Sequence, residues 1–542
     1  MKEMRLETTD RLSNLPKHIL DDILSRLPEE DVARTRILSK AWNDTSSTSP
    51  NLRFSQHKYI FGVRKNDGSH QNEILPMPIV ELERKRNKFA DHVEKTLTRF
   101  HDQCLAIREF KLHMNCSGSQ SMYRRIDHWM RLVVEGGVQE LNLLLSHDRE
   151  TWYECAVDHC CFPPSILEAK SLIKLTLMYG KIDHSLVNNP VQFSSLQKLS
   201  LSYLTVKDEQ VIQNIISSCP LIEYLSLLLC HMEGQNNIGL KSIRIHGLCK
   251  LKTVRALMIQ EIDIDAPNLE YLEYAPSFSN IPFKTNMDKC KNLKTLSLSH
   301  LRSIIITDKW LFELLLKFPL LERLRLARCN FSEKIKVSSA HLKVLEFLDY
   351  FPSSILKEVH IDAPNLRSLK YDTSAEMPTL SFLSNSNLLQ IELNLLFVSY
   401  WDFEKLRQFL QSFGHRSILS CLSIKIDHQY NKFDIDALGD VSEPPPSIKH
   451  LNLWIDPKLQ TYVLHLVTSL LCSCCPTAIH VRHDYKISDT VIETLCDILR
   501  SGKHECYCSP RDIKCWWHIL KGLQLTKSIG EVIDETTIQL EY

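Results

Sequence analysis

The pattern of hydrophobic and polar positions repeats along most of this chain. From about residue 105 onward, an apolar residue is followed by two others, a leucine, one other and a second leucine, as in SLIKLTL, SLQKLSL and NLKTLSL. The last two apolar positions of each copy lie two residues apart, so both point to the same face of a short strand. The pattern therefore predicts a series of short strands, each with one buried face.

The segments between these copies predict an irregular return path. VIQNIISS follows Asp208 and KWLFELLLKF follows Asp308, and a proline ends each segment, which predicts two helices opened by an aspartate. Elsewhere the return contains Ala-Pro-Asn, at residues 266–268 and 363–365, and there we expect short loops instead of helices.

Successive copies begin roughly 18–34 residues apart, which overlaps the period of leucine-rich repeats. Each unit can bury its apolar face only by stacking on its neighbours. The spacing predicts an irregular α/β solenoid, with a curved parallel sheet on the concave side and helices and loops on the convex side. A doubly wound α/β fold is the alternative, but its strands would be continuous apolar runs, and the alternation here favours the repeat.

Residues 10–54 follow a different, helical pattern. Ile19, Leu20, Ile23, Leu24 and Leu27 recur at steps of three and four, which places them on one stripe of a helix opened by Leu15 and Pro16. Pro28 should end this helix, and Asp31 is placed to cap the next one. Fewer than fifty residues build only a marginal core, so a segment this apolar is expected to dock on another surface.

The order of these residues resembles the F-box, especially its plant form. The motif reads LP, an Ile/Leu stripe, LP, an acidic turn, a Val-Ala-Arg helix and then LSKAW, with Ala41 where the family usually has a basic residue. The resemblance implies binding of the Skp-type adaptor of a cullin–RING ubiquitin ligase. The implied adaptor-binding residues are Leu15, Pro16, Ile19, Leu20, Ile23, Leu24, Leu27, Pro28, Val32, Leu38 and Trp42.

The rest of the chain is similar to plant F-box/leucine-rich-repeat proteins. KFADHVEKTLTRF resembles the amphipathic helix that follows the F-box in that group. We expect an all-helical F-box followed by the solenoid, in four parts. These are the F-box (10–56), a linker with an amphipathic helix (57–104), the leucine-rich repeats (105–460) and a C-terminal repeat or cap (461–542).

Composition narrows the expected partners and compartment. Lys+Arg and Asp+Glu both number 65, and this balance argues against nucleic acid as a partner. The basic run at residues 83–88 falls in the expected linker and reads as a solvated face. With no apolar stretch near 18 residues and no apolar leader, we expect neither a membrane span nor secretion. The expected compartment is the cytoplasm and/or nucleus, where the eighteen cysteines stay mostly reduced.

The cysteines and histidines that could be catalytic or metal-binding residues fit structural roles better. Cys230 and Cys329 follow repeat copies and are read as core thiols. The C-terminal Cys and His residues lack the paired spacing of a zinc site, so we expect no metal. The sequence also lacks a phosphate-binding loop, and we expect no cofactor and no catalytic residues. The C-terminal residues in question are Cys472, Cys474, Cys475, His504, Cys506, Cys508 and Cys515.

The expected function is substrate recognition within an SCF (Skp–cullin–F-box) ubiquitin ligase, ahead of proteasomal degradation. Strand alternation turns a row of polar side chains away from the core, and these should bind the target protein. The row comprises Tyr224, Tyr271, Glu273, Arg323, Arg325 and Lys370. The alternatives are a small-molecule or hormone co-receptor that uses the same array, a leucine-rich-repeat scaffold outside SCF complexes, and a ligase with its own catalytic cysteine.

Overall fold

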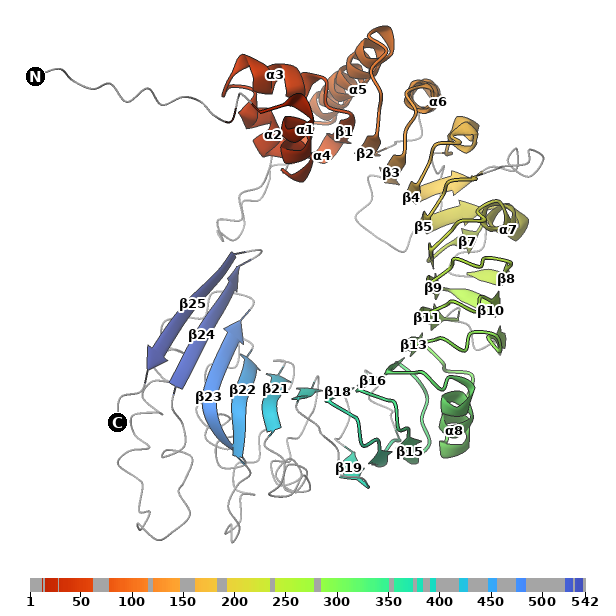
Figure 1. Cartoon of the computed structure of the whole chain (residues 1–542), viewed down its shortest axis with the longest axis vertical. Coiled ribbons are helices and arrows are strands. Elements are labelled where there is room, and N and C mark those ends of the chain that lie inside the picture. Colours follow the sequence, from red (N-terminus) through yellow and green to blue (C-terminus); the bar gives the residue numbers. More distant parts are fainter. Residues whose placement is uncertain are drawn as a thin grey trace, which may run out of the picture. The chain divides into compact units, whose positions relative to one another are not determined.

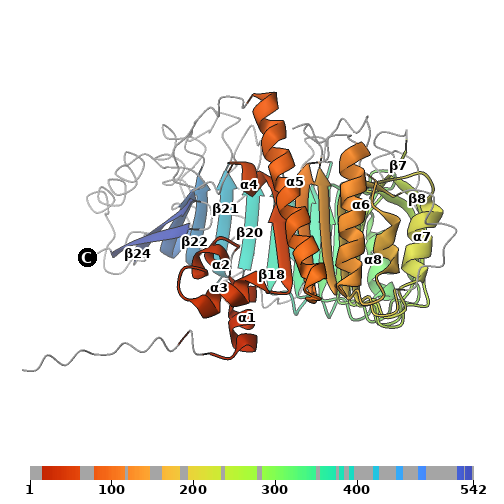
Figure 2. The same ribbon diagram turned by 90° about the horizontal axis from the view of Figure 1, so that it is seen from above.

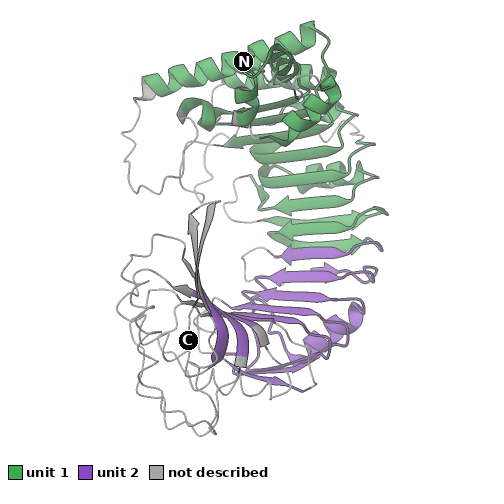
Figure 3. Ribbon diagram, turned by 60° about the vertical axis from the view of Figure 1, so that its left-hand side comes forward, with its two compact units in different colours: residues 1–65, 72–266 green, residues 66–71, 267–542 purple. Residues whose placement is uncertain are grey.

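The computed structural model divides the chain into two compact units, 1–65 with 72–266 and 66–71 with 267–542 (Figure 3). Each unit is described by itself. The described residues are 12, 15–27, 29–61, 78–115, 120–146, 161–182, 193–233, 239–276, 284–349, 355–373, 378–383, 390–395, 419–426, 447–455, 474–483, 522–529 and 532–539.

The first unit begins with three short helices, α1 (Lys17–Arg26), α2 (Glu29–Thr35) and α3 (Lys40–Ser47). Helix α1 starts directly after Pro16, as the sequence predicts. The expected cap at Asp31 is wrong, because α2 already begins at Glu29; the Asp31 carboxylate instead accepts a hydrogen bond from Arg34 at 3.0 Å. The hydroxyl of Ser39 caps α3 by accepting from the Trp42 amide.

After these helices come β1 (Asn51–Ser55), α4 (Gln56–Phe61) and α5 (Ile79–Asp102). The basic run at residues 83–88 was expected in a linker, but it lies inside α5, where Arg84 pairs with Glu81 at 2.7 Å. Helix α6 (Gln120–Glu135) packs beside α5, as Figures 1 and 2 show. The Trp129 indole N–H donates to the Glu94 carboxylate at 2.6 Å across this contact.

The inner sheet of the first unit is parallel throughout. Its strands pair in the order β1, β2, β3, β4, β5, β6 and β9, with β7 (His231–Met232) beside β5. Leu175, Leu199 and Leu225 stand in register on neighbouring strands, and all three are buried. The further strands span Glu109–Asn115 (β2), Glu140–Ser146 (β3), Lys174–Ile182 (β4), Lys198–Val206 (β5), Tyr224–Leu228 (β6) and Thr253–Leu257 (β9).

Helices and short strands connect these inner strands. A 3-10 turn, η1 (Pro164–Glu168), and α7 (Glu209–Ser217) join the outer layer, and the Asp208 carboxylate caps α7 as predicted. Two outer strands, β8 (Leu240–His246) and β10 (Ile259–Asp265), pair in parallel. The expected loop at 266–268 is present, but the return before it also contains strand β10, which was not predicted from the sequence.

The second unit repeats this arrangement with its own inner sheet. Its parallel strands pair in the order β11, β13, β14, β16, β18, β20, β21, β22, β23 and β24, and β25 closes the series by pairing antiparallel with β24. A hairpin thus ends the series of inner strands. The strands span Tyr271–Ala275 (β11), Thr295–Ser299 (β13), Arg323–Ala327 (β14), Val344–Asp349 (β16), Ser368–Thr373 (β18), Gln390–Leu395 (β20), Leu419–Ile426 (β21), Ser447–Ile455 (β22), Cys475–His483 (β23), Gly522–Ile529 (β24) and Val532–Gln539 (β25).

The outer layer of the second unit contains α8 (Asp308–Lys317) and strands β15 (Lys334–Ser338), β17 (Glu358–Asp362) and β19 (Thr379–Phe382), with β12 (Lys284–Asn286) as a further short strand. Strands β15, β17 and β19 form a small parallel sheet. The helix after Asp308 is confirmed, but its cap is Thr307, whose hydroxyl accepts from the Trp310 amide. The return before the expected loop at 363–365 again contains a strand, β17, that was not predicted from the sequence.

A left-handed residue stands five positions after the first residue of many inner strands, inside β4 and β5 and directly after β6, β9, β13 and β14. None of these residues is glycine, yet their φ angles all lie between 53° and 65°. They are Tyr179, Tyr203, Leu229, Met258, His300 and Arg328. Each occupies the same place in its repeat, so the left-handed conformation is a feature of the repeat and not of one side chain.

Candidate interaction surfaces

The F-box-like helices use part of their predicted binding stripe as their own core. Leu20, Leu24 and Trp42 are almost fully buried against one another. The partly buried side chains Leu15, Ile23, Leu27 and Val32 pack around this cluster. These residues hold α1, α2 and α3 together, so in this conformation the three buried ones contact one another and are shielded from solvent.

Other apolar side chains of this region face outward, from α1, from the residue before it and from the turn between α2 and α3. Ile19 is 39% exposed, Leu38 61% and Ile37 86%, and Pro16 is also exposed. Ile37 is absent from the sequence-predicted set, although its place beside Leu38 in the run ILSKAW could have indicated it. Pro28 lies outside the described residues. Exposed apolar side chains mark a protein interaction site where they gather in one patch, whereas single ones are common on any protein surface.

Ionic and backbone contacts hold β1 and α3 against the rest of the first unit. The Arg53 guanidinium binds the Glu109 carboxylate through Nη2 at 2.7 Å and Nε at 3.1 Å, and Lys111 adds a contact at 2.6 Å. Burial alone would raise the pKa of Glu109, but the hydrogen bonds from Lys111 and Arg53 outweigh it and lower the pKa. Arg99 of α5 donates to the Ser47 carbonyl at 2.9 Å.

The predicted target-binding residues lie on the inner strands, between the buried leucines. Tyr224 belongs to the first unit, and the other five belong to the second unit. All six side chains are at least partly exposed. The expected alternation holds in the core, since Leu199, Leu296 and Leu324 are buried. The same alternation predicts that Ser202 of β5 faces away from the core, but its side chain is buried.

In the second unit, charges of opposite sign alternate along one row of the inner sheet. Arg325, Glu346, Lys370 and Glu392 stand in register on four neighbouring strands. Lys370 and Glu392 approach to 2.5 Å, while Arg323 reaches Glu346 at 2.9 Å. Sequence reasoning named the cations but missed that they are paired, because register between distant repeats is not visible in one repeat.

In the first unit, an apolar row runs along the same face of the inner sheet. Its members alternate with buried core residues, share one register position and are partly exposed, and on β5 the buried Ser202 stands between the members on β4 and β6. They are Leu144, Met178, Leu228 and Leu257. The sequence does contain a signal for this row, an apolar residue directly after the second leucine of the repeat, as in YLSLLL. The prediction from the sequence used only the two buried leucines of that pattern.

The cysteines that follow repeat copies are core thiols, as predicted. Cys230 and Cys329 are buried, and burial raises the pKa of the Cys230 thiol to about 12. A thiol in that state is not a nucleophile. Among the described residues, no group of three or more His, Cys, Asp or Glu side chains could hold a metal ion. Cys474 and Cys475 are buried, and the remaining C-terminal candidates lie outside the described residues.

None of the helices described is both long enough and apolar enough to cross a membrane.

Comparison with known proteins matches three family models to this chain. A model described as "F-box domain" matches residues 12–54. A second, described as "FBD-associated F-box protein At5g56370, LRR repeats", matches residues 126–297, and a third, "At1g61320/AtMIF1, LRR domain", matches residues 277–421.

Similar proteins of Arabidopsis thaliana carry F-box in their names, and two of the three described below carry LRR-repeat as well. The F-box/LRR-repeat protein At3g59200 is 26% identical over 302 residues, which is 53% of this chain and 49% of the relative. The F-box/FBD/LRR-repeat protein At1g13570 is 28% identical over 399 residues, 69% of this chain and 78% of the relative. The putative F-box protein At3g58860 is 26% identical over 278 residues, which is 50% of this chain and 52% of the relative. The chain thus spans about half the length of several relatives that it matches.

Proposed function

The chain carries an F-box followed by leucine-rich repeats, as in the plant F-box/LRR-repeat proteins that it resembles, and we propose that it is a substrate receptor of an SCF-type ubiquitin ligase. Its F-box binds a Skp-type adaptor and, through it, the cullin and RING subunits. Its repeats hold a target protein for ubiquitination. The protein acts in the cytoplasm and/or nucleus.

The observation that carries this proposal is the division of apolar residues within the F-box. Leu20, Leu24 and Trp42 form a small core, and Ile19 and Leu38 remain exposed above it. Leaving such side chains in water forgoes the favourable free energy that their burial would contribute. Their exposure is accounted for if an adaptor covers them, with Leu15, Ile23, Leu27 and Val32 shaping the same surface.

The target-binding part of the proposal rests on the inner strands within residues 105–460. The solvent-facing rows of these strands contain aromatic and charged side chains, including Tyr224 and Tyr271 and the two arginines Arg323 and Arg325. Tyr and Arg are frequent anchors of protein interfaces. Binding both the adaptor and the target raises the effective concentration of target at the ligase, and the bond-making residues belong to the other subunits.

Affinity purification from plant cells with the proteasome blocked tests the adaptor half. The comparison is between the full chain and the double variant Leu15→Ala with Pro16→Ala. Loss of adaptor and cullin from the variant, with the target retained, is expected. Full recovery of the adaptor by a correctly folded variant would overturn the assignment.

The target half is tested by Arg323→Glu with Arg325→Glu. Both cations approach Glu346, at 2.9 and 3.7 Å, so the reversal also removes an internal ion pair. The variant Glu346→Gln serves as the matched control, because it breaks the same pair and keeps both arginines. We expect target capture to fall for the reversal and adaptor binding to stay. If capture instead depends on residues 480–542, the target surface is assigned to the wrong part of the chain.

A further inference from the structure

The outer face of α8 exposes large apolar side chains that its own unit does not cover. Phe312 is 57% exposed and Leu316 64%, and they stand four residues apart on the same side of the helix. Leu320, just beyond the helix, is also exposed. Leu311, Leu314 and Leu315 form the opposite, buried side of α8. The helix is therefore apolar on both sides.

Helix α7 provides an internal comparison, because it occupies the same place in its repeat. Both helices are capped on the N-terminal side and followed by proline, at Pro220 and Pro319. Aligned on these prolines, Gln213 stands where α8 has Phe312, and Ser217 stands where α8 has Leu316. The fold of the repeat thus accepts polar residues at both positions.

The polar residues of α7 have partners within the repeat. The Gln213 amide brackets Arg244 of β8, donating to its carbonyl at 2.8 Å and accepting from its N–H at 3.0 Å. Phe312 cannot make these bonds. The replacement of polar by apolar residues in α8 is therefore not required for folding, and it leaves apolar area in water.

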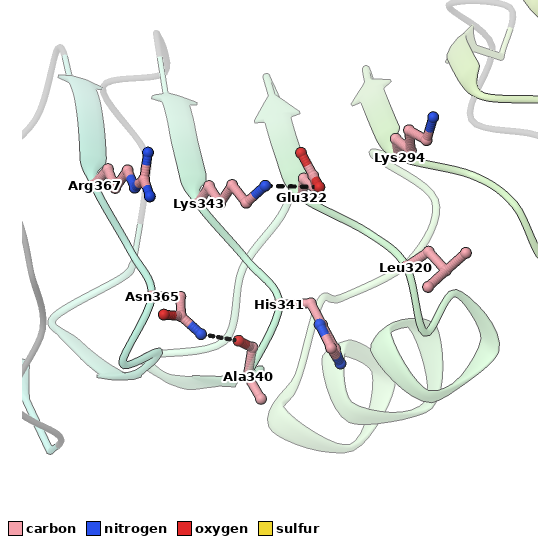
Figure 4. Close-up of a pocket in the computed structure, with 8 residues that line it drawn as sticks. All are labelled: Lys294, Leu320, Glu322, Ala340, His341, Lys343, Asn365 and Arg367. Atoms are coloured by element: carbon pink, nitrogen blue, oxygen red, sulfur yellow. Dashed lines mark hydrogen bonds and ion pairs between the residues drawn. The ribbon is translucent and has the colours of Figure 1, made fainter.

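A pocket of about 240 Å³ lies next to this apolar face, and Leu320 belongs to both (Figure 4). Basic side chains dominate its lining. The charged and imidazole groups at the pocket are Lys294, Lys343, Arg367, His341 and Glu322. Glu322 is the only acidic residue among those lining it.

The acidic residues nearby do not balance these cations. Glu322 binds Lys343 at 2.7 Å, and Lys294 turns to Glu270 at 3.0 Å. Arg367 has no ion pair among the described residues. The pKa of Glu322 is lowered mainly by the hydrogen bond from Lys343, and the charges of Lys343, Lys294 and Arg367 lower it further. One guanidinium therefore remains available for an oxyanion, which it can bind in a bidentate manner.

We propose that the outer face of α8 and the adjacent basic pocket form a docking site for a peptide segment of a partner protein, in which two apolar residues precede a carboxylate or phosphate group. The apolar side chains pack on Phe312, Leu316 and Leu320, and the oxyanion binds Arg367. This site lies on the outer layer and at the strand-entry edge of the second unit, apart from the rows proposed to bind the target.

The test uses the full chain and fluorescein-labelled peptides in anisotropy titrations. Each peptide carries Leu and Phe separated by one to four Gly or Ser residues, followed by serine, glutamate or phosphoserine. We expect the anionic peptides to bind about tenfold more tightly than the serine peptide, the effect of a charge-assisted hydrogen bond. A preference for phosphoserine over glutamate identifies phosphate as the source of the oxyanion, and equal binding identifies a carboxylate.

Three variants separate the parts of the site. Arg367→Glu should remove the advantage of the anionic peptides and leave the serine peptide unchanged. Phe312→Gln with Leu316→Ser copies the residues of α7, so it should fold normally and weaken every peptide. Lys252→Glu, at the corresponding strand-entry position of the first unit beside Glu223, is the control and should change nothing.

Absence of binding by every peptide overturns the proposal, as does equal affinity for the three end groups. Unchanged binding by the α7-like variant excludes the apolar face. A loss in Lys252→Glu as large as in Arg367→Glu shows non-specific attraction between charges and overturns the site as well. The adaptor and target experiments are independent of all these outcomes.

Discussion

Single leucines of the inner strands each fill the space between one strand and the outer layer of their own repeat. Leu296 and Leu324 stand in register on β13 and β14, and both are fully buried. Their neighbours along the strand, such as Arg323, face the opposite side and are exposed. One step along the chain therefore separates a residue that determines stability from one that does not.

Replacing an inner leucine should be costly. We expect Leu199→Ala, Leu296→Ala and Leu324→Ala each to lower the free energy of unfolding by about 2–5 kcal/mol, from lost burial and the cavity left behind. Urea unfolding of the full chain, followed by tryptophan fluorescence, measures the change. Ser200→Ala, on the opposite face of β5, is the control and should stay within about 0.5 kcal/mol. Equal effects at both kinds of position would contradict the register.

His300 should make stability depend on pH. Burial, together with Arg328 and Arg302, lowers its pKa to about 4 from the usual 6.5. As pH falls, the unfolded chain takes up this proton first, so the folded state loses stability between about pH 6.5 and pH 4. His300→Asn keeps a residue that tolerates positive φ and removes the titration. Its urea midpoint should therefore fall less between pH 7 and pH 4.5, and an unchanged fall would contradict the assignment.

At the scale of elements, the sequence predicts what depends on local pattern. The strands of the inner sheets and helices α7 and α8 follow from leucine spacing and from their bounding residues. The outer strands were missed, although β10 and β17 carry alternating apolar residues before Ala-Pro-Asn, as in EIDIDAP and EVHIDAP. Segments this short become strands only when a neighbour pairs with them, and the sequence of one repeat does not show that neighbour.

The candidate surfaces divide in the same way. The F-box stripe can be predicted from helical periodicity, but periodicity does not separate the buried Leu20 from the exposed Ile19 beside it. That separation depends on how α1 packs on α3. The paired state of Arg325 and Glu346 depends on register across two repeats. The left-handed residues of the repeats have no sequence signal, because none of them is glycine or asparagine.

The contact between Arg53 of β1 and Glu109 of β2 should stabilise the pairing of these two elements. Arg53→Gln removes two hydrogen bonds from a mostly buried carboxylate, and we expect a loss of about 1–3 kcal/mol in unfolding free energy. Glu109→Gln and the double variant complete a double-mutant cycle, measured by urea unfolding. A coupling above about 0.5 kcal/mol supports the contact, and additive effects would contradict it.

At the scale of the whole molecule, the chain combines separate surfaces within a balanced net charge, with 65 basic and 65 acidic residues. The F-box offers exposed aliphatic side chains above a small core. The inner sheets offer rows that are apolar in the first unit and charged in the second. A substrate receptor needs two surfaces, one that binds the ligase and one that binds the target. In the proposed function the F-box has the first role and the inner sheets have the second.

The central claim is that the exposed apolar residues of the F-box bind the Skp-type adaptor. Isothermal titration calorimetry of the purified full chain with the adaptor tests this claim, using Ile19→Asp with Leu38→Asp. Val80→Asp is the control, because Val80 is 78% exposed on α5 and lies outside the F-box. We predict that the F-box variant weakens binding by about thirtyfold or more, the effect of losing a hot spot of about 2 kcal/mol, and that the control binds like the unmodified chain. Unchanged affinity of a folded F-box variant, or an equal loss in the control, would contradict the account.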